Sequence, residues 1–510
     1  MSDPALPGES IGIVGAGFGG LAAAAYLADA GADVTIYEQQ PQVGGVAGVI
    51  EEDGFRFDTG PSWYLMPGLF ERFFEHFGHE PEDFYDLVRL DPHYRIFWTD
   101  GDSVDIPSNT DRAAELFESY EDGAGEAFEA YLDQSAETYE IGMDRFVVPN
   151  RSRFRDYVSL DVAKSARGLS LLGTMDDHVA DYFDHPKLRQ IVQYTLVFLG
   201  GAPHNTPALY NLMSHVDFEL GVYYPQGGMY AVVEAMESVC KAQGVDILTS
   251  TAVTALDPQD SGVAIEYDGG RRTHDRVVSN APVAHTEREL LPDGAVNRDP
   301  AYWDDRTYAP SAYMCYLGVD GELPELDHHT LVLPTYWDEH FESIFDAPGW
   351  PDNPAYYVNV PSQTDPTAAP NGKETLVVLV PIAPGLEDDE SAREQMRDDI
   401  LDSLAEHAGV DLRGRIEFER EMCVSDYRGQ FNKPQGTALG LAHTLFQTGP
   451  MRPSHRAPGV NRLYYVGGDT NPGIGVPMCL LSGEHVAETI EEDATGTGVI
   501  DTVLPGRLRS

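Results

Sequence analysis

Three glycines near the N-terminus have the spacing of a loop that can hold phosphate groups. Gly15, Gly17 and Gly20 form the pattern G-x-G-x-x-G between an apolar segment and an alanine-rich one. In such a loop the first glycine makes a tight turn, the second lets backbone approach a pyrophosphate, and the third lets a helix pack close to a sheet. The amides and positive dipole end of that helix would face the phosphates. With Ala16 and Phe18 between them, these glycines are candidates for binding a dinucleotide.

The elements around the loop are those that the motif requires. A strand is expected at residues 11–14, a helix after Gly20 and a second strand at 34–37, followed by Glu38. An acid about 20 residues after the glycines can grip the two ribose hydroxyls, which disfavours a 2′-phosphate and therefore NADP. This context also disfavours a glycine-rich turn without a ligand. The triplet alone does not separate FAD from NAD.

Composition and charge limit the protein class. A chain of 510 residues is expected to form about two to four domains. Its 84 acidic and 33 basic residues give a net charge of −51, and the repulsion between them opposes compaction in dilute buffer. At molar salt the screening length falls to about 3 Å. We therefore predict an extremely halophilic host and a fold that loosens when salt is removed. The absence of a basic face disfavours nucleic-acid binding.

Other features of the sequence bear on location and metals. No run of 18 apolar residues and no N-terminal targeting pattern is present, so we expect a cytoplasmic protein. The four cysteines include no C-x-x-C pair. His328 and His329 are expected on a strand, where neighbouring side chains point to opposite faces and suit a metal poorly. We expect no metal site.

The segments after Glu38 resemble one family in their order. The glycine triplet, the acid, the pair Gly44-Gly45 and GFRFDTGP at 54–61 look like the flavin amine oxidase and phytoene desaturase superfamily. The resemblance to its carotenoid desaturase branch runs from about Ile11 to Ile490. Its further segments are 64–78, 90–101, 328–350, 361–381, 431–456 and 463–490.

The resemblance implies an α/β fold. We expect a Rossmann-like FAD-binding domain of the glutathione reductase type, with an inserted α+β substrate domain. Residues 245–248 are expected to begin a strand that 251–256 continue. The expected segments are FAD-binding at 1–101, 222–290 and 415–495, substrate-binding at 102–221 and 291–414, and a loose tail at 496–510.

FAD is the cofactor that the resemblance implies. Asp469 matches a family acid that bonds the ribityl or pyrophosphate region, and Val253 matches a residue near the adenine. The family usually has arginine after the glycine pair, where this chain has Val46. A helix beginning near Pro477 would stabilise reduced flavin by about 1 kcal/mol, and Gly483 would let it pack closely. The cofactor-binding candidates are Gly15, Ala16, Gly17, Phe18, Gly20, Glu38, Gly44, Gly45, Val253, Gly468, Asp469, Val476, Pro477 and Met478.

The resemblance also implies a reaction. A carotenoid desaturase removes a hydride and a proton from a CH₂–CH₂ unit beside a polyene, in an apolar channel. The substrate would be a hydrophobic carotenoid, either on the route from phytoene to lycopene or a later one that receives 3,4 double bonds toward fifty-carbon bacterioruberin. Such a substrate favours peripheral contact with the inner face of the membrane. By family position, Tyr64, Arg95, Phe431 and Asn432 lie near the channel. These residues identify neither a general base nor the electron acceptor.

Two other readings remain open. The first is another flavin oxidase, acting on amines or porphyrinogens, for which Cys479 is the nearby candidate to hold FAD covalently. The second is a non-enzymatic lipid-binding relative of the Rab escort and GDP-dissociation inhibitor type. Such relatives tend to lose the cofactor motifs, which are nearly complete in this chain.

Overall fold

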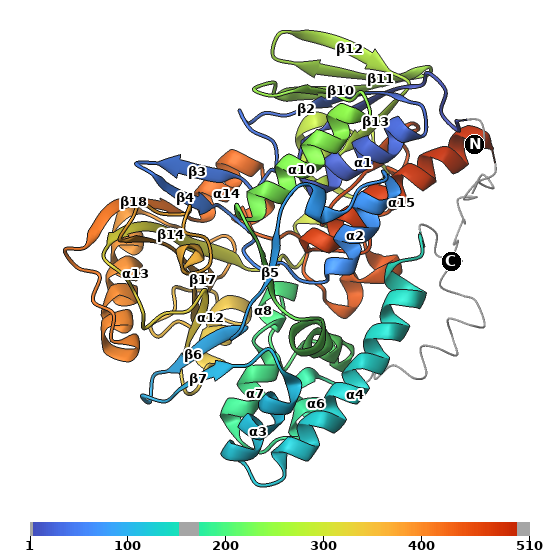
Figure 1. The fold of residues 1–510 in the computed structure, drawn as a ribbon. Coiled ribbons are helices and arrows are strands. Elements are labelled where there is room, and N and C mark those ends of the chain that lie inside the picture. Colours follow the sequence, from blue (N-terminus) through green and yellow to red (C-terminus); the bar gives the residue numbers. More distant parts are fainter. Residues whose placement is uncertain (1–3, 152–172, 497–510) are drawn as a thin grey trace.

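The fold is organised around two large β-sheets with helices on their faces (Figure 1). The computed structural model describes residues 4–151 and 173–496. Residues 152–172, which belong to the expected substrate segment, and most of the expected tail lie outside the described residues. Within the described part, no helix is long and apolar enough to cross a lipid bilayer.

The first sheet is parallel and contains the N-terminal strand at its centre. Its order is β19-β13-β1-β2-β9, and all its pairings are parallel. β1 and β2 lie where the sequence predicts them, on either side of the glycine loop. The strands are β1 (Ser10–Val14), β2 (Asp33–Tyr37), β9 (Asp246–Leu248), β13 (Arg276–Ser279) and β19 (Leu463–Tyr465).

Three helices pack beside this sheet and join segments from the start, middle and end of the chain. They are α1 (Phe18–Asp29), α10 (Met229–Ala242) and α15 (Val476–Thr495). α1 is buried from Phe18 to Leu27, which its small side chains permit. α15, drawn red, lies close to α1, drawn blue (Figure 1). The sequence predicts the start of α15 to within one residue.

A small antiparallel sheet of β10 (Val253–Gln259), β11 (Gly262–Tyr267) and β12 (Gly270–His274) corrects one expectation. Residues 251–256 do not continue the strand at 245–248. β9 ends at Leu248 in the parallel sheet, and Ser250 has a left-handed φ of 51°. That turn redirects the chain, so β10 pairs with β11 in a separate sheet.

The second large sheet has the order β18-β14-β17-β16-β15-β6-β7. β15 pairs with β6 in parallel, and the other pairings are antiparallel. Its strands are β6 (Tyr94–Trp98), β7 (Ser103–Ile106), β14 (Ser311–Asp320), β15 (His329–Leu333), β16 (Tyr356–Asn359), β17 (Lys373–Ile382) and β18 (Ile416–Met422).

A helical group lies below the second sheet in the view of Figure 1. It includes α3 (Thr110–Tyr120), α4 (Ala124–Gly142), α6 (Met175–Ala180), α7 (Pro186–Gln193), α8 (Leu196–Leu199), α9 (Leu212–Ser214) and a π-helical turn, His215–Leu220. The other α-helices and strands of the described residues are α2 (Pro67–His76), α11 (Val283–His285), α12 (Asp338–Phe345), α13 (Glu390–Ser403), α14 (Val424–Phe431) and the strand pairs β3 (Val49–Glu52) with β4 (Phe55–Asp58) and β5 (Leu87–Arg89) with β8 (Tyr223–Pro225).

The sheet memberships differ from the expected domain boundaries at two places. β6 falls in the segment 1–101 and β18 in the segment 415–495, yet both belong to the second sheet. We therefore propose that the first boundary lies before β6 and the last one after β18. The assignment of each segment to a cofactor or a substrate domain stays a prediction.

Candidate functional site

Two glycine-rich segments from opposite ends of the chain meet beside the parallel sheet. We call residues 15–20 the N-terminal glycine segment and residues 467–475 the C-terminal glycine segment. A Cβ atom built on Gly19 would lie 3.0 Å from the Cα of Gly467. The backbones therefore approach to a distance that larger residues would prevent. This contact brings together two of the segments on which the expected cofactor site depends.

Asn280 fills the space between the two segments, and sequence reasoning missed it. Its Nδ2 donates to the carbonyl of Val466 at 3.2 Å. Its Oδ1 would lie 2.8 Å from a Cβ on Gly17 and 3.1 Å from one on Gly20. The sequence offered one signal, because Asn280 follows β13 at the carboxyl edge of a parallel sheet, where ligands of such sheets gather.

The second glycine pair lies against the first loop. Gly44 forms a parallel bridge with Gly17, and its amide donates to the carbonyl of Ala16 at 2.8 Å. A Cβ on Gly45 would lie 3.4 Å from the Cα of Gly17. The carbonyl of Val46 accepts a hydrogen bond from the Thr59 hydroxyl at 3.0 Å. The backbone that carries Val46 is therefore fixed, although the arginine typical of the family is absent.

The helix ends at this site fit an anionic dinucleotide. No side chain caps α1 at Gly17 or α15 at Gly475, and the first-turn amides of a helix have no partner within it. α10 differs, because Asp58 accepts from the amides of Met229 at 2.9 Å and Tyr230 at 3.0 Å. Burial raises the pKa of Asp58 to about 6. α1 and α15 thus keep amides that can face phosphate.

Glu38 is buried at the end of β2 and holds the backbone of the loop. Its Oε2 accepts from the amide of Ala16 and its Oε1 from the amide of Gln40, each at 2.7 Å. Burial raises the pKa of Glu38 above its usual range, and these amides oppose the shift. Each carboxylate oxygen has a second lone pair that could accept from a ribose hydroxyl while Glu38 holds the loop. The expected ribose contact stays a prediction.

The remaining cofactor candidates lie in three places. Asp469 accepts from the amides of Val283 at 3.0 Å and Leu441 at 3.2 Å, which ties three segments together. Val253 begins β10 and packs against the cluster that contains Val14 and Tyr37. The residues of the first turn of α15 are partly exposed; they are Val476, Pro477 and Met478. Their contacts with a cofactor stay predictions.

Cys479, which follows them on α15, bears on the covalent alternative. Burial raises the pKa of its thiol to about 11. The thiolate is the reactive form of cysteine, so little nucleophile is present near neutral pH. The environment of Cys479 therefore disfavours covalent attachment of a flavin.

The four channel candidates contact different sets of neighbours. Tyr64 is fully buried, with its hydroxyl 3.1 Å from that of Tyr85 and its ring stacked on Phe70. Arg95, on β6, forms ion pairs with Asp105 and Asp327. Phe431 ends α14, and Asn432 after it donates to the Gln39 side chain at 3.3 Å. These contacts do not join the four residues into one group, and their role in a channel stays a prediction.

A group of buried aromatic and polar side chains between β6, β15 and the helices was also missed. Trp63 stacks on His329, with ring centres 4.0 Å apart. Beside Trp63, the hydroxyls of Tyr94 and Tyr194 donate to Asp217 at 2.9 and 3.1 Å. Burial raises the pKa of Asp217 to about 7, opposed by the two tyrosines.

The histidine pair departs from the expected geometry. His328 precedes β15, and its ring centre lies 4.5 Å from that of His329. The two rings therefore contact each other instead of pointing to opposite faces. Their Nδ1 atoms pair with the hydroxyls of Thr364 at 2.7 Å and Tyr357 at 2.6 Å. Burial holds the pKa of both rings well below the usual range.

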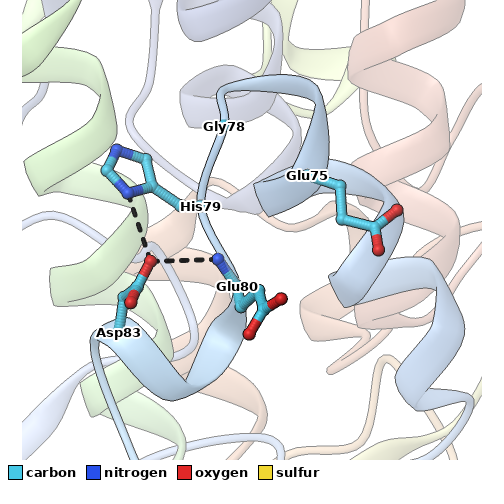
Figure 2. A pocket seen from close by; sticks show the side chains of 5 residues that line it. All are labelled: Glu75, Gly78, His79, Glu80 and Asp83. Atoms are coloured by element: carbon cyan, nitrogen blue, oxygen red, sulfur yellow. Dashed lines mark hydrogen bonds and ion pairs between the residues drawn. The ribbon is translucent and has the colours of Figure 1, made fainter.

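A surface hollow in the described part of the chain lies elsewhere and is polar. It is lined by Glu75, Gly78, His79, Glu80 and Asp83 (Figure 2). Asp83 accepts from the Glu80 amide at 3.1 Å and lies 3.4 Å from the His79 ring. Its acidic lining does not suit an apolar polyene, so it is not the expected channel. The channel itself stays a prediction.

The parallel sheet, the glycine loop and the two uncapped helix ends are those of an α/β fold of the dinucleotide-binding type. The family model described as flavin-containing amine oxidoreductase matches residues 18–491. A carotenoid 3,4-desaturase of Haloarcula japonica is 57% identical over 97% of this chain and 100% of its own length. A zeta-carotene-forming phytoene desaturase of Myxococcus xanthus is 34% identical over 96% of each chain.

Among solved structures, an oxidoreductase from Methanosarcina mazei superposes with a TM-score of 0.61 at 18% identity, covering 94% of this chain and 100% of its own. At that identity the likeness supports the fold alone. The chain belongs to the flavin-containing amine oxidoreductase family, in its carotenoid desaturase branch. The family resemblance and the fold class expected from the sequence are thereby confirmed.

Proposed function

We propose that this chain is an FAD-dependent carotenoid desaturase that introduces 3,4 double bonds into a carotenoid. The observation that carries the proposal is the 57% identity to the Haloarcula japonica 3,4-desaturase over the whole of that protein. The strongly acidic composition agrees with a halophilic source. FAD is preferred over NAD because the matching family model is that of flavin-containing oxidoreductases.

The residues at this site would bind and orient the cofactor. The first-turn amides of α1 would face the pyrophosphate, and those of α15 would face the end where negative charge gathers. Glu38 braces the N-terminal loop, and Asn280 bonds Val466 just before the C-terminal glycine segment. When bound, FAD supplies a hydride acceptor for an allylic carbon, and the substrate loses its second hydrogen as a proton. The protein contributes orientation and the exclusion of water.

A second candidate within the same chemistry is an early desaturase acting on phytoene. The 34% identity to the Myxococcus xanthus enzyme supports an early desaturase, but less strongly than the 57% identity supports a 3,4-desaturase. The two differ in substrate and not in cofactor or reaction type. An amine or porphyrinogen oxidase and a non-enzymatic lipid-binding protein receive less support, because the named relatives act on carotenoids.

Deletion of the gene in its host, followed by pigment analysis, tests the proposal. A 3,4-desaturase predicts accumulation of a carotenoid saturated at the 3,4 bond, whereas phytoene accumulation would identify the early enzyme. Return of the wild-type gene should restore the pigments, and a Gly17→Val variant should not. Unchanged pigments after deletion would contradict both assignments.

We also propose a peripheral contact with the lipid that holds the substrate. Phe446 is 76% exposed and Met451 is 52% exposed, and both lie in one short segment. Large exposed apolar side chains can mark interaction surfaces. In a flotation assay with liposomes at molar salt, wild type should rise with the lipid and Phe446→Ser/Met451→Ser should stay behind. Equal behaviour of the two proteins would contradict the contact.

A further inference from the structure

Arg452 is a buried cation that binds the backbone of the C-terminal glycine segment. It is 4% exposed. Its Nη2 donates to the carbonyl of Gly468 at 2.6 Å, and its Nε to that of Thr470 at 3.1 Å. The same guanidinium donates to Leu441 at 2.9 Å and Gln447 at 3.0 Å. One side chain therefore holds residues 441–447 against residues 468–470.

The partners of Arg452 are unusual for a buried cation. All four acceptors are neutral carbonyls, and Arg452 forms no ion pair with an acidic side chain of the described residues. The oxygens of the nearby acid, Asp469, accept hydrogen bonds from the amides of Val283 and Leu441. Burial lowers the pKa of Arg452 to about 10, opposed by Asp469, so the guanidinium is charged at neutral pH. A buried charge without a bonded counterion is costly. Asp469 offsets part of that cost through space, and a further anion nearby would offset more.

The position of Arg452 indicates which anion this is. Gly468 and Thr470 belong to the segment that meets the N-terminal glycine segment at Gly467. The uncapped start of α15 follows at Gly475. A dinucleotide held between the segments would bring a pyrophosphate, and a reduced flavin would add negative charge. Either charge would be attracted by the guanidinium that holds this segment.

We propose that Arg452 is a positioning residue that fixes the C-terminal glycine segment and places a positive charge behind a bound, anionic dinucleotide. The inference rests on the proposed binding of FAD. It assigns Arg452 two separable effects. Its hydrogen bonds set the shape of the segment, and its charge favours the more negative, reduced state of the cofactor over the oxidised one.

The test measures FAD affinity and midpoint potential in the full-length protein at molar salt. Arg452→Met removes charge and donors, Arg452→Gln keeps an amide donor without charge, and Arg452→Lys keeps the charge with a different donor geometry. Arg415→Met is the matched control, because Arg415 also donates to two backbone carbonyls, those of Asp320 and Glu322, but lies just before the start of β18 in the second sheet. Thermal melting of each apoprotein shows whether the variant folds.

We expect Arg452→Met to raise the Kd for FAD at least tenfold, the change of about 1.4 kcal/mol that loss of a charged hydrogen bond would cause. We expect a more negative potential in both neutral variants, by about 30 mV for each tenfold greater loss of affinity for the reduced state. Arg452→Lys should stay near the wild-type potential, and Arg415→Met should change neither quantity.

Wild-type affinity and potential in a folded Arg452→Met or Arg452→Gln protein would overturn the inference. Weaker FAD binding with an unchanged potential would overturn the role of the charge and leave only packing. If Arg452→Met does not fold, the midpoint potentials of Arg452→Gln and Arg452→Lys can be compared instead, because these two variants also differ in charge. A wild-type protein that takes up no FAD would instead contradict the proposed function, so the two failures are distinct.

Discussion

Gly483 on α15 lies directly against Ala22 on α1. A Cβ built on Gly483 would be 2.4 Å from the Cβ of Ala22 and 2.8 Å from the amide nitrogen of Ala23. The two helices that begin at the candidate cofactor site are therefore in close contact through a glycine. The expectation that Gly483 permits close packing is confirmed by this distance.

Gly483→Ala should therefore destabilise the protein. The added methyl group cannot be accommodated unless α15 moves away from α1, and overpacking of this kind costs about 1–3 kcal/mol. Thermal melting at fixed molar salt should show a lower Tm. Gly429→Ala is the control, because Gly429 also lies in a helix but has nothing within 4 Å of an added Cβ. A Tm lowered equally in both variants would contradict the packing argument.

Substitutions at Gly17 and Gly20 should have different effects. A Cβ on Gly17 meets the flexible Asn280 side chain at 2.8 Å, whereas one on Gly20 meets the carbonyl of Gly15 at 2.2 Å. Gly17→Val should abolish FAD binding and leave most of the apoprotein Tm, because the larger side chain displaces Asn280 and crowds the expected pyrophosphate position beside it. Gly20→Ala should destabilise the apoprotein itself by about 1–3 kcal/mol and therefore lower its Tm.

Fluorescence titration with FAD and melting of the apoproteins separate these two effects. Retained flavin in Gly17→Val would refute the assignment of the loop. The short distance from a Cβ on Gly20 to the carbonyl of Gly15 predicts that the turn at Gly15 cannot relax. A wild-type Tm in the Gly20→Ala apoprotein would contradict this prediction.

Asp217 should make stability depend on pH. Its pKa is raised by burial to about 7, compared with 3.8 for an ordinary aspartate. Between these values the folded state binds more protons than the unfolded state, so stability falls as pH rises from about 4 to 7 and levels off above. The full effect is on the order of 4 kcal/mol. Melting from pH 4.5 to 8 should show a flatter profile for Asp217→Asn than for wild type.

Asp184→Asn is the control for this profile, because the Asp184 side chain is 96% exposed. It should reproduce the wild-type dependence on pH. A profile for Asp217→Asn that parallels wild type would show that another group titrates in this range.

Stability should rise steeply with salt. The net charge is −51. The screening length for repulsion between the acidic groups is about 10 Å at 0.1 M salt and only about 3 Å at 1 M. At an unfolding entropy of about 2.1 cal/mol/K per residue, each kcal/mol that screening restores raises the Tm by roughly 1 °C, so a gain of a few kcal/mol raises it by a few degrees between these concentrations. Melting in KCl gives the measurement, with sucrose of equal osmolality as the uncharged control. Equal stabilisation by sucrose would argue against charge screening as the cause.

Local patterns predicted the part of the site that is local in sequence. The strand, glycine loop, helix and second strand at residues 10–37 follow from side-chain periodicity and from glycine at positions where backbone must approach backbone. β4 and the start of α15 were predictable for the same reason. The family followed from the order of several such motifs.

Contacts between distant segments were not predictable in this way. Arg452 on Gly468, and the chain reversal at Ser250, depend on neighbours that periodicity does not report. The membership of β6 in the second sheet depends on β15, more than 200 residues away, because Arg95 pairs with Thr330. The neighbours of the four channel candidates were likewise not predictable from the sequence. The fold shows that each candidate has a different set of neighbours.

The amino-acid sequence by itself determined the dinucleotide loop, the acidic surface and the family, because each is written in the types and spacing of neighbouring residues. Only the tertiary structure decided that Gly19 meets Gly467, with Asn280 between them. The physical reason is that such contacts arise when buried faces of distant elements pack together. Their partners are fixed by the whole core and not by any single segment.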